Sequence, residues 1–331
     1  MKTWPIIVLS IVVCLVCGEI FFRSFYPQSQ YSVTYAPWGW RHIPNTEVTF
    51  WGEKPGWRWN LKPSVKIKYG VSGLRGRAWA NPYILILGDS FAEDMGSPDK
   101  NLISSYLEDK ILLPVMNAGH YGFCNAQELM YYLAEGYKYK PNIVLIFYTG
   151  DTANPNYAVM EDGKLKLKWK TFTRKQKLYK NIVSAIRLRL HLGSFILNRL
   201  HDFSWFEKIA DRGGLNDKIP ITNFDTYSVL DDFVSVDKHI WVKFKKEIEK
   251  NGSRLIIMNC MGEFTPPERA FFDLWGIEYF EITGLPNPNI KRILDKESGV
   301  YDPAFESHRF GYKSNSIVSQ KIYDYLKGSL K

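Results

Sequence analysis

The 331-residue sequence has few cysteines and none of the residue patterns typical of a bound cofactor. Two of its four cysteines, Cys14 and Cys17, lie in a hydrophobic run, so Cys124 and Cys260 allow one disulfide at most and are better explained as buried free thiols. No metal-ligand spacing, phosphate-binding loop or dinucleotide fingerprint is present, and we expect neither a cofactor nor a metal. The sequence also lacks an internal repeat and a nucleic-acid-binding module, so we expect no nucleic-acid partner.

An almost continuous hydrophobic run extends from residue 4 to residue 22, reading WPIIVLSIVVCLVCGEIFF. As a helix it is long enough to cross the ~30 Å hydrocarbon core of a membrane. No small-x-small cleavage site follows between Gly18 and Tyr31, so we expect an uncleaved, single-pass signal anchor. Lys2 before the run and Arg23 after it give a small positive-inside bias. We expect the folded domain to lie outside the cytoplasm, in the periplasm or at the cell surface.

The remaining chain divides into a lead-in segment, residues 24–80, and a larger domain, residues 81–330. In the larger domain we predict strands at 83–88, 113–119, 142–150, 254–260 and 278–282, with helices near 102–110, 125–137, 227–250, after 266 and near 315–326. Hydrophobic runs that alternate with helices predict an α/β fold, in which helices flank both faces of a doubly wound parallel sheet. An insertion at about residues 155–225 interrupts this pattern.

The insertion is strongly basic, in a chain whose formal net charge is +9. In its first part Lys164, Lys166, Lys168 and Lys170 alternate with hydrophobic residues, which predicts a hairpin, whereas the later part has helical spacing. These cationic faces are either only solvated or lie against an anionic surface, such as lipid headgroups or a glycan. The nearby anchor makes a contact with the membrane surface plausible.

The residues that follow the predicted strands are candidates for chemistry, because ligands bind outside the carboxyl ends of parallel strands. Ser90 follows the first strand, and His308 lies in the last loop before the final helix. A serine hydroxyl becomes a nucleophile only with a neighbouring base, a group that orients the base and N–H donors for the oxyanion. A Gly-Asp-Ser sequence alone is equally typical of a helix N-cap. The combination of Ser90 and His308 in this order favours a serine hydrolase.

The chain resembles the SGNH/GDSL hydrolase family, particularly its membrane-anchored bacterial members, from about residue 73 to residue 326. Like these members, the chain has GLR before the first strand. LGDSF (87–91) resembles the nucleophile block, which implies Ser90 as nucleophile and its N–H as an oxyanion donor. NAGHYGFCNAQEL (117–129) resembles the second block, which implies the Gly122 N–H as another donor. DPAFESHRFGY (302–312) resembles the last block, which implies His308 as the base. The resemblance also implies a flavodoxin-like sheet.

Two positions depart from the family pattern. Asp151 stands where the third block has the asparagine that donates to the oxyanion, and an ionised carboxylate has no donor. Asn154, three residues later, is the alternative donor. The last block usually has an aspartate two or three residues before the histidine. Here Glu306 is the first candidate to orient His308, and Asp302 is the second.

The resemblance implies a membrane-anchored serine ester hydrolase or acyl transferase that works through an acyl-serine intermediate. Its substrate would be an acyl ester, either an O-acyl group on cell-surface polysaccharide or a lipid ester. The alternative is a catalytically impaired relative, in which Asp151 has removed the third oxyanion donor. Such a protein would serve as a binding or accessory component of an envelope polysaccharide system.

Overall fold

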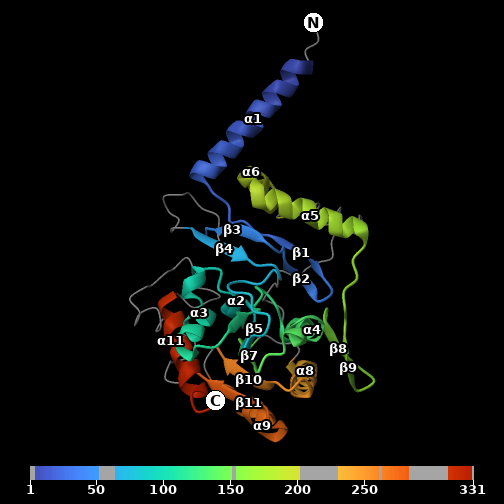
Figure 1. Ribbon diagram of the computed structural model, residues 1–331. Coiled ribbons are helices and arrows are strands. Elements are labelled where there is room, and N and C mark those ends of the chain that lie inside the picture. Colours follow the sequence, from blue (N-terminus) through green and yellow to red (C-terminus); the bar gives the residue numbers. More distant parts are fainter. Residues whose placement is uncertain are drawn as a thin grey trace.

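The chain folds around a parallel sheet with helices on both faces, and a long N-terminal helix projects from one end of this body (Figure 1). The computed structural model describes residues 4–51, 64–150, 154–201, 230–260, 263–282 and 312–329.

The described elements follow the hydrophobic runs and helical periodicities of the sequence. The helices are α1 (Trp4–Phe25), α2 (Ser90–Glu93), α3 (Ile103–Ile111), α4 (Asn125–Ala134), α5 (Arg174–Arg189), α6 (His191–His201), α8 (Leu230–Lys250), α9 (Pro266–Trp275) and α11 (Tyr312–Leu326), with 3-10 turns η2 (Asp99–Asn101) and η3 (Gly136–Tyr139). The strands are β1 (Val33–Ala36), β2 (Gly39–His42), β3 (Thr46–Phe50), β4 (Val65–Tyr69), β5 (Ile84–Gly88), β6 (Val115–Asn117), β7 (Ile143–Tyr148), β8 (Ala158–Glu161), β9 (Lys164–Leu167), β10 (Arg254–Asn259) and β11 (Glu278–Glu281).

The central sheet has five parallel strands in the order β11-β10-β7-β5-β6. Counted along the chain this is the doubly wound order 2-1-3-4-5, so the α/β prediction is confirmed. The second strand of the sheet, β6, lies on one side of β5, and the third, β7, lies on the other. The chain therefore reverses its winding direction between β5 and β7, and the carboxyl ends of these strands form the topological switch point, where ligands bind in such sheets.

Helices cover both faces of the sheet. Successive side chains of a strand point to opposite faces, and in this sheet the side chains on both faces are hydrophobic. In β5, Leu85 and Leu87 pack in the same hydrophobic cluster as side chains of α4 and α8. Ile84 and Ile86 pack in a second cluster, with side chains of α3 and α11. All four of these β5 side chains are buried, which explains why the strand is a continuous hydrophobic run without alternating polar residues.

The lead-in forms two antiparallel hairpins, β1–β2 and β3–β4, between α1 and the central sheet (Figure 1). Of these strands only β4 shows the alternation typical of a strand in its sequence, Val65-Lys66-Ile67-Lys68. Trp38 and Trp40 from the first hairpin are buried in the same cluster as Leu85 and Leu87. The lead-in thus contributes to the main hydrophobic core.

The described part of the insertion consists of the predicted hairpin, β8–β9, and two helices, α5 and α6. The hairpin contacts α8 and lies well away from α1, whereas α5 packs on β1 and α6 packs on α1 (Figure 1). Lys164 and Lys166 are on β9, on the hairpin away from α1. The prediction that the lysines from 164 to 170 contact an anionic surface therefore concerns a part of the molecule remote from the anchor, and it stays a prediction.

A core substitution in the central strand β7 should destabilise the protein strongly. Ile146→Ala removes buried methyl and methylene groups from a side chain that is 0% exposed, while Val71, on a turn, is 74% exposed. We expect a loss of about 2–5 kcal/mol for Ile146→Ala and less than about 0.5 kcal/mol for Val71→Ala. Denaturant unfolding of the detergent-solubilised chain, followed by circular dichroism, measures both. Similar losses in the two variants would contradict this account of the core.

Candidate active site

Ser90 is the first residue of α2, directly beyond the carboxyl end of β5. Asp89 caps the helix, because its Oδ1 accepts the N–H of Phe91 at 2.9 Å. Its Oδ2 accepts the hydroxyl of Thr149, which follows β7, at 3.2 Å. As a first-turn residue, Ser90 keeps its N–H outside the helical hydrogen bonds. Asp89 thus shapes the turn and joins the two strand ends that flank the switch point.

Two glycines allow α2 to pack closely on neighbouring strand ends. A Cβ at Gly88, where φ is +149°, would lie 2.9 Å from both Ala92 Cβ and Phe147 Cβ. A Cβ at Gly119 would lie 2.6 Å from the backbone nitrogen of Glu93. Any larger residue at either position would push α2 away from the sheet.

The second block of the sequence lies beside the first at this edge of the sheet. The His120 N–H donates to the Gly88 carbonyl at 2.9 Å. Gly122, two residues further on, has a φ of +74°, and a Cβ there would meet nothing within 4 Å. Gly122 is therefore open on its Cα side.

Asn154 lies near the start of α4, which follows Gly122. The Cys124 thiol, at the N-cap of α4, makes a hydrogen bond with the backbone of Asn154; burial nevertheless raises the pKa of this thiol to about 12. The side-chain oxygen of Asn154 accepts the N–H of Asn156 at 2.9 Å. This bond uses the amide oxygen of Asn154, a residue that is 7% exposed.

Four predicted site residues lie outside the described residues: Asp151, Asp302, Glu306 and His308. The structure does describe the chain that follows them. Asn315, seven residues after His308, donates from Nδ2 to the carboxylate of Asp94, to Ser97 Oγ at 3.2 Å and to the Asn101 carbonyl at 2.8 Å. These contacts hold the beginning of α11 against the C-terminal end of α2.

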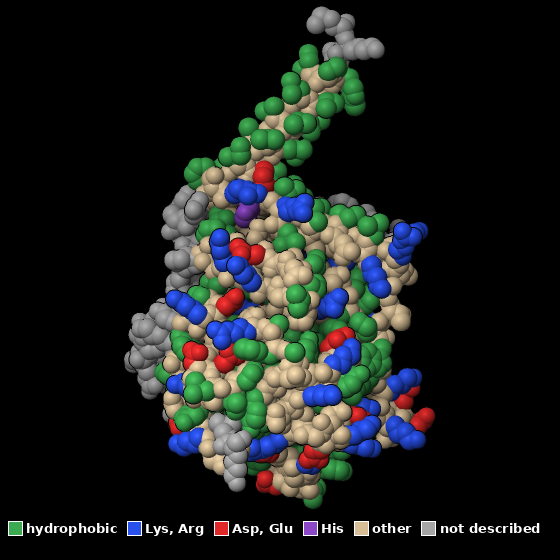
Figure 2. All heavy atoms as spheres, in the orientation of Figure 1, with side chains coloured by type: hydrophobic (Ala, Val, Ile, Leu, Met, Phe, Trp, Pro, Cys, Tyr) green, Lys and Arg blue, Asp and Glu red, His purple; other side chains and the backbone are tan. Residues whose placement is uncertain are grey.

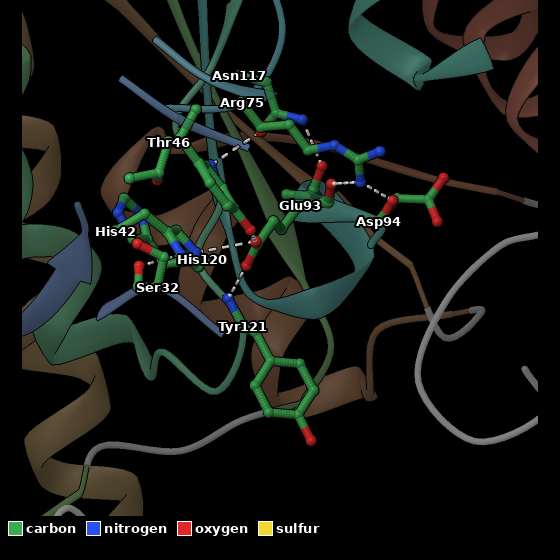
Figure 3. A network of polar contacts seen from close by, with 12 residues as sticks. Ser32, His42, Thr46, Arg75, Glu93, Asp94, Asn117, His120 and Tyr121 are labelled. Atoms are coloured by element: carbon green, nitrogen blue, oxygen red, sulfur yellow. Dashed lines mark hydrogen bonds and ion pairs between the residues drawn. The ribbon is translucent and has the colours of Figure 1, made fainter. Parts of the chain in front are cut away.

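A buried polar network surrounds Glu93, the last residue of α2 (Figure 3). The Glu93 side chain is 0% exposed, and its Oε1 lies 2.9 Å from His42 Nε2, on β2. The same oxygen accepts the Tyr69 hydroxyl, from β4, at 2.7 Å, and Oε2 accepts the Tyr121 N–H at 2.5 Å. The carboxylate therefore joins α2 to both hairpins of the lead-in and to the second block.

The network keeps Glu93 ionised although it is fully buried. Burial alone would raise its pKa, but the charge of His42, the hydrogen bond to His42 and the Tyr121 N–H lower it to about 2. Burial, reinforced by the Glu93 charge, raises the pKa of Tyr69 well above its usual value. Tyr69 thus stays protonated at neutral pH and donates to an ionised carboxylate.

Arg75, from the GLR sequence of the lead-in, holds the other side of α2 (Figure 3). Its guanidinium is buried and donates to the Glu93 carbonyl at 2.8 Å and to the carbonyls of Asp94 and Ser97. Its backbone bridges to Tyr69 and to Asn117. Carbonyls at a helix C-terminus need such donors, since the helix does not satisfy them itself.

His120 has the environment of a packing residue. Its ring stacks on Phe123 at 4.5 Å between centroids and lies edge-on to Trp40 at 5.6 Å. Burial, together with the charge of His42, lowers its pKa to about 4, so the ring is neutral at pH 7. Among the described residues, no group of three or more His, Cys, Asp or Glu side chains is arranged to hold a metal ion.

Sequence reasoning missed the roles of His42, Arg75 and Glu93. Arg75 and Glu93 belong to the GLR and GDSFAED sequences, and His42 lies in the aromatic stretch YAPWGWRH. The local sequence does not single these residues out, because YAPWGWRH also contains Arg41 and GDSFAED also contains Asp89 and Asp94. Their pairing could not be read from the sequence, since His42 and Glu93 are far apart along the chain.

Comparisons with known proteins give structural neighbours only: no family model matches the chain, and no curated protein matches its sequence. TesA has 10% identity and a TM-score of 0.38, covering 75% of this chain and 99% of that chain. The psychrotrophic esterase EstA from Pseudoalteromonas sp. has 13% identity and a TM-score of 0.40, covering 75% and 97%. A carbohydrate esterase has 12% identity and a TM-score of 0.38, covering 92% and 88%. At these values the neighbours do not establish a family for this chain.

Replacing Glu93 by Gln should destabilise the protein at neutral pH by an amount that decreases in acid. The folded-state pKa is about 2, below the ordinary value of 4.5, so this stabilisation is present above pH 4.5 and is lost as the pH falls towards 2. A shift of this size corresponds to about 3 kcal/mol. Denaturant unfolding of wild type and Glu93→Gln at several pH values measures the difference.

Glu47→Gln is the matched control, because the Glu47 side chain is 43% exposed and its ion pairs with Lys66 and Lys68 are at the surface. We expect a loss of less than about 1 kcal/mol for this variant. A Glu93→Gln loss that is equally small at pH 7, or that does not diminish below pH 4.5, would contradict the role assigned to the buried carboxylate.

Proposed function

We propose that this chain is a membrane-anchored serine ester hydrolase or acyl transferase of the SGNH/GDSL type. Ser90 Oγ attacks the ester carbonyl carbon, and the His308 imidazole takes the hydroxyl proton. Glu306, or else Asp302, orients the imidazole. The N–H groups of Ser90 and Gly122 stabilise the oxyanion.

The tetrahedral intermediate then collapses to an acyl-serine, and the imidazolium gives its proton to the leaving alcohol. Water or an acceptor hydroxyl, deprotonated by the imidazole, attacks the acyl-serine and restores the free hydroxyl of Ser90. The amide nitrogen of Asn154 supplies a third oxyanion donor in the place of the family asparagine. The proposed substrates are acyl esters of an envelope glycan or lipid.

The observation that carries the proposal is the position of Ser90 at the switch point of the sheet. It begins the turn of helix that follows β5, and the Asp89–Thr149 contact joins this turn to the end of β7. The Gly122 backbone, open on its Cα side, belongs to the block that pairs with Gly88. The contacts of Asn315 support the role of His308 as the base, because they hold α11, the helix that follows His308, against the end of α2.

Labelling with a fluorophosphonate probe tests the nucleophile. An activated serine reacts with the probe, so the full chain should be labelled, whereas Ser90→Ala and His308→Ala should lose at least about 100-fold in labelling rate. Ser104→Ala is the matched control, since Ser104 on α3 is as buried as Ser90, at 5% exposure for both. This control should be labelled like wild type.

The alternative function has one observation in its favour, the aspartate at position 151. If the folded wild type is not labelled, the hydrolase proposal fails. The chain would then be a binding or accessory component of an envelope polysaccharide system. Loss of one oxyanion donor alone costs on the order of 10²–10³ in rate, so slow but Ser90-dependent labelling still supports an enzyme.

The contacts at the foot of α1 support its role as a retained anchor. The helix is long and apolar enough to cross a membrane, and none of its residues is buried. Near its end, the Glu19 carboxylate accepts the N–H groups of His191 and Leu192, at 3.0 and 2.9 Å, and so caps α6. Arg23 donates to the Arg189 carbonyl at 2.8 Å, at the end of α5. A cleaved signal peptide has no such partners in the mature domain.

The mass of the mature protein tests this point. We expect protein extracted from membranes to carry residues 4–22 and to stay with the membrane after an alkaline wash, because a spanning helix is not released by loss of charge contacts. Intact-mass measurement reads the N-terminus directly. A mature chain that begins after residue 22 would contradict the anchor.

A further inference from the structure

Helices α5 and α6 form a basic platform, residues 174–201, at the end of the body from which α1 projects (Figure 1). From Gly163 to His201 the sequence contains no Asp or Glu. The basic residues of the platform are Arg174, Lys175, Lys177, Lys180, Arg187, Arg189 and Arg199. Blue and green side chains line this edge of the body, next to the foot of α1 (Figure 2).

The inner face of α5 is fixed on the lead-in. The Ser184 hydroxyl donates to the Val33 carbonyl, and the Thr34 hydroxyl donates to the side chain of Asn181 at 3.1 Å. The Lys180 ammonium lies over the Tyr35 ring, 5.5 Å from its centroid, and burial lowers the pKa of this lysine to about 8. With this face packed, the opposite face of α5 points away from the body.

The outer face of α5 is hydrophobic at its centre and basic at its ends. Residues three and four apart share a helix face, so Arg174, Leu178, Ile182, Ala185 and Arg189 lie in one row. Leu178 is 59% exposed and Ile182 is 50% exposed. No other described residue covers these two side chains, and the row itself contains no acidic residue.

We infer that the basic platform lies on an anionic bilayer surface, with Leu178 and Ile182 entering the interface and the exposed basic side chains, such as Arg174 and Lys175, contacting lipid phosphates. The inference rests on the anchoring part of the proposed function. We assign a bilayer to the face of the platform because α1, the proposed anchor, is joined to α6 by Glu19 and to the end of α5 by Arg23. A helix with an apolar row and flanking cations at the foot of an anchor has the composition of an interfacial helix.

Lipid quenching of site-specific fluorophores tests the inference in the full chain, reconstituted in nanodiscs with anionic and doxyl-labelled lipids. Labels are placed at Leu178→Cys and Ile182→Cys, with Leu274→Cys on α9, 80% exposed and remote from α1, as control. Cys14 and Cys17 are replaced by Ala, except that one variant keeps Cys14 to report on α1. The two remaining cysteines are buried.

We expect strong quenching at positions 178 and 182 and at Cys14, and none at position 274. Cys14 separates the two proposals. Quenching at Cys14 without quenching at 178 and 182 overturns the platform while the anchor stands, whereas no quenching at Cys14 means that the anchor itself fails. Protection of position 182 from aqueous iodide without lipid quenching would indicate another protein surface and would also overturn the inference.

Charge neutralisation tests the anionic part of the inference with matched variants. Each basic residue near an anionic surface contributes about five-fold to binding, so Arg174→Gln, Lys175→Gln and Lys177→Gln together should lower quenching at position 182 by at least about half. Lys164→Gln and Lys166→Gln on β9, together with Lys168→Gln directly after it, remove the same charge from exposed positions and should leave the quenching at position 182 unchanged. Equal effects of the two triple variants, or quenching that persists without anionic lipid, would overturn the role of charge.

Discussion

The buried carboxylate of Glu93 is the constraint on which the arrangement around Ser90 depends. A carboxylate without access to water must be paired and hydrogen-bonded, or it destabilises the fold by several kcal/mol. His42, Tyr69 and the Tyr121 N–H meet this need, and they come from β2, β4 and the loop after β6. The short helix that begins with Ser90 therefore acquires its position only when the lead-in and the second block are both in place.

Arg75 and Asn315 extend the same constraint towards the C-terminal helix. Arg75 satisfies three carbonyls at and after the end of α2, and Asn315 binds the side chain of Asp94 in the same turn. Four residues of α2 cannot form a stable helix alone, because helix nucleation is unfavourable. Polar contacts from three distant segments replace the missing length, so the turn that carries Ser90 is held by tertiary structure.

The central sheet could be predicted from the sequence, whereas this network could not. Runs such as 83–88 and 142–150 are hydrophobic throughout because helices cover both faces, and their spacing is a local signal. The end of the first run also placed Ser90 correctly, close behind a strand. The pairing of His42 with Glu93 depends on a buried contact between distant segments. The strands β1 to β3 were missed because Trp, Pro and Gly in the lead-in obscure the alternation typical of strands.

The platform and the candidate active site share one rigid frame. Ser184 of α5 binds the Val33 carbonyl, Val33 pairs with His42 across β1–β2, and His42 pairs with Glu93, three residues after Ser90. Each link is a packed or hydrogen-bonded contact between regular elements, so it transmits position without requiring a second conformation. In the proposed arrangement, a chain tethered by one helix could rotate about it, and a helix face resting on the bilayer would remove that freedom. The orientation of Ser90 relative to the membrane would then follow from the same contacts that hold α2, which suits the proposed acyl-ester substrate at or near the lipid surface.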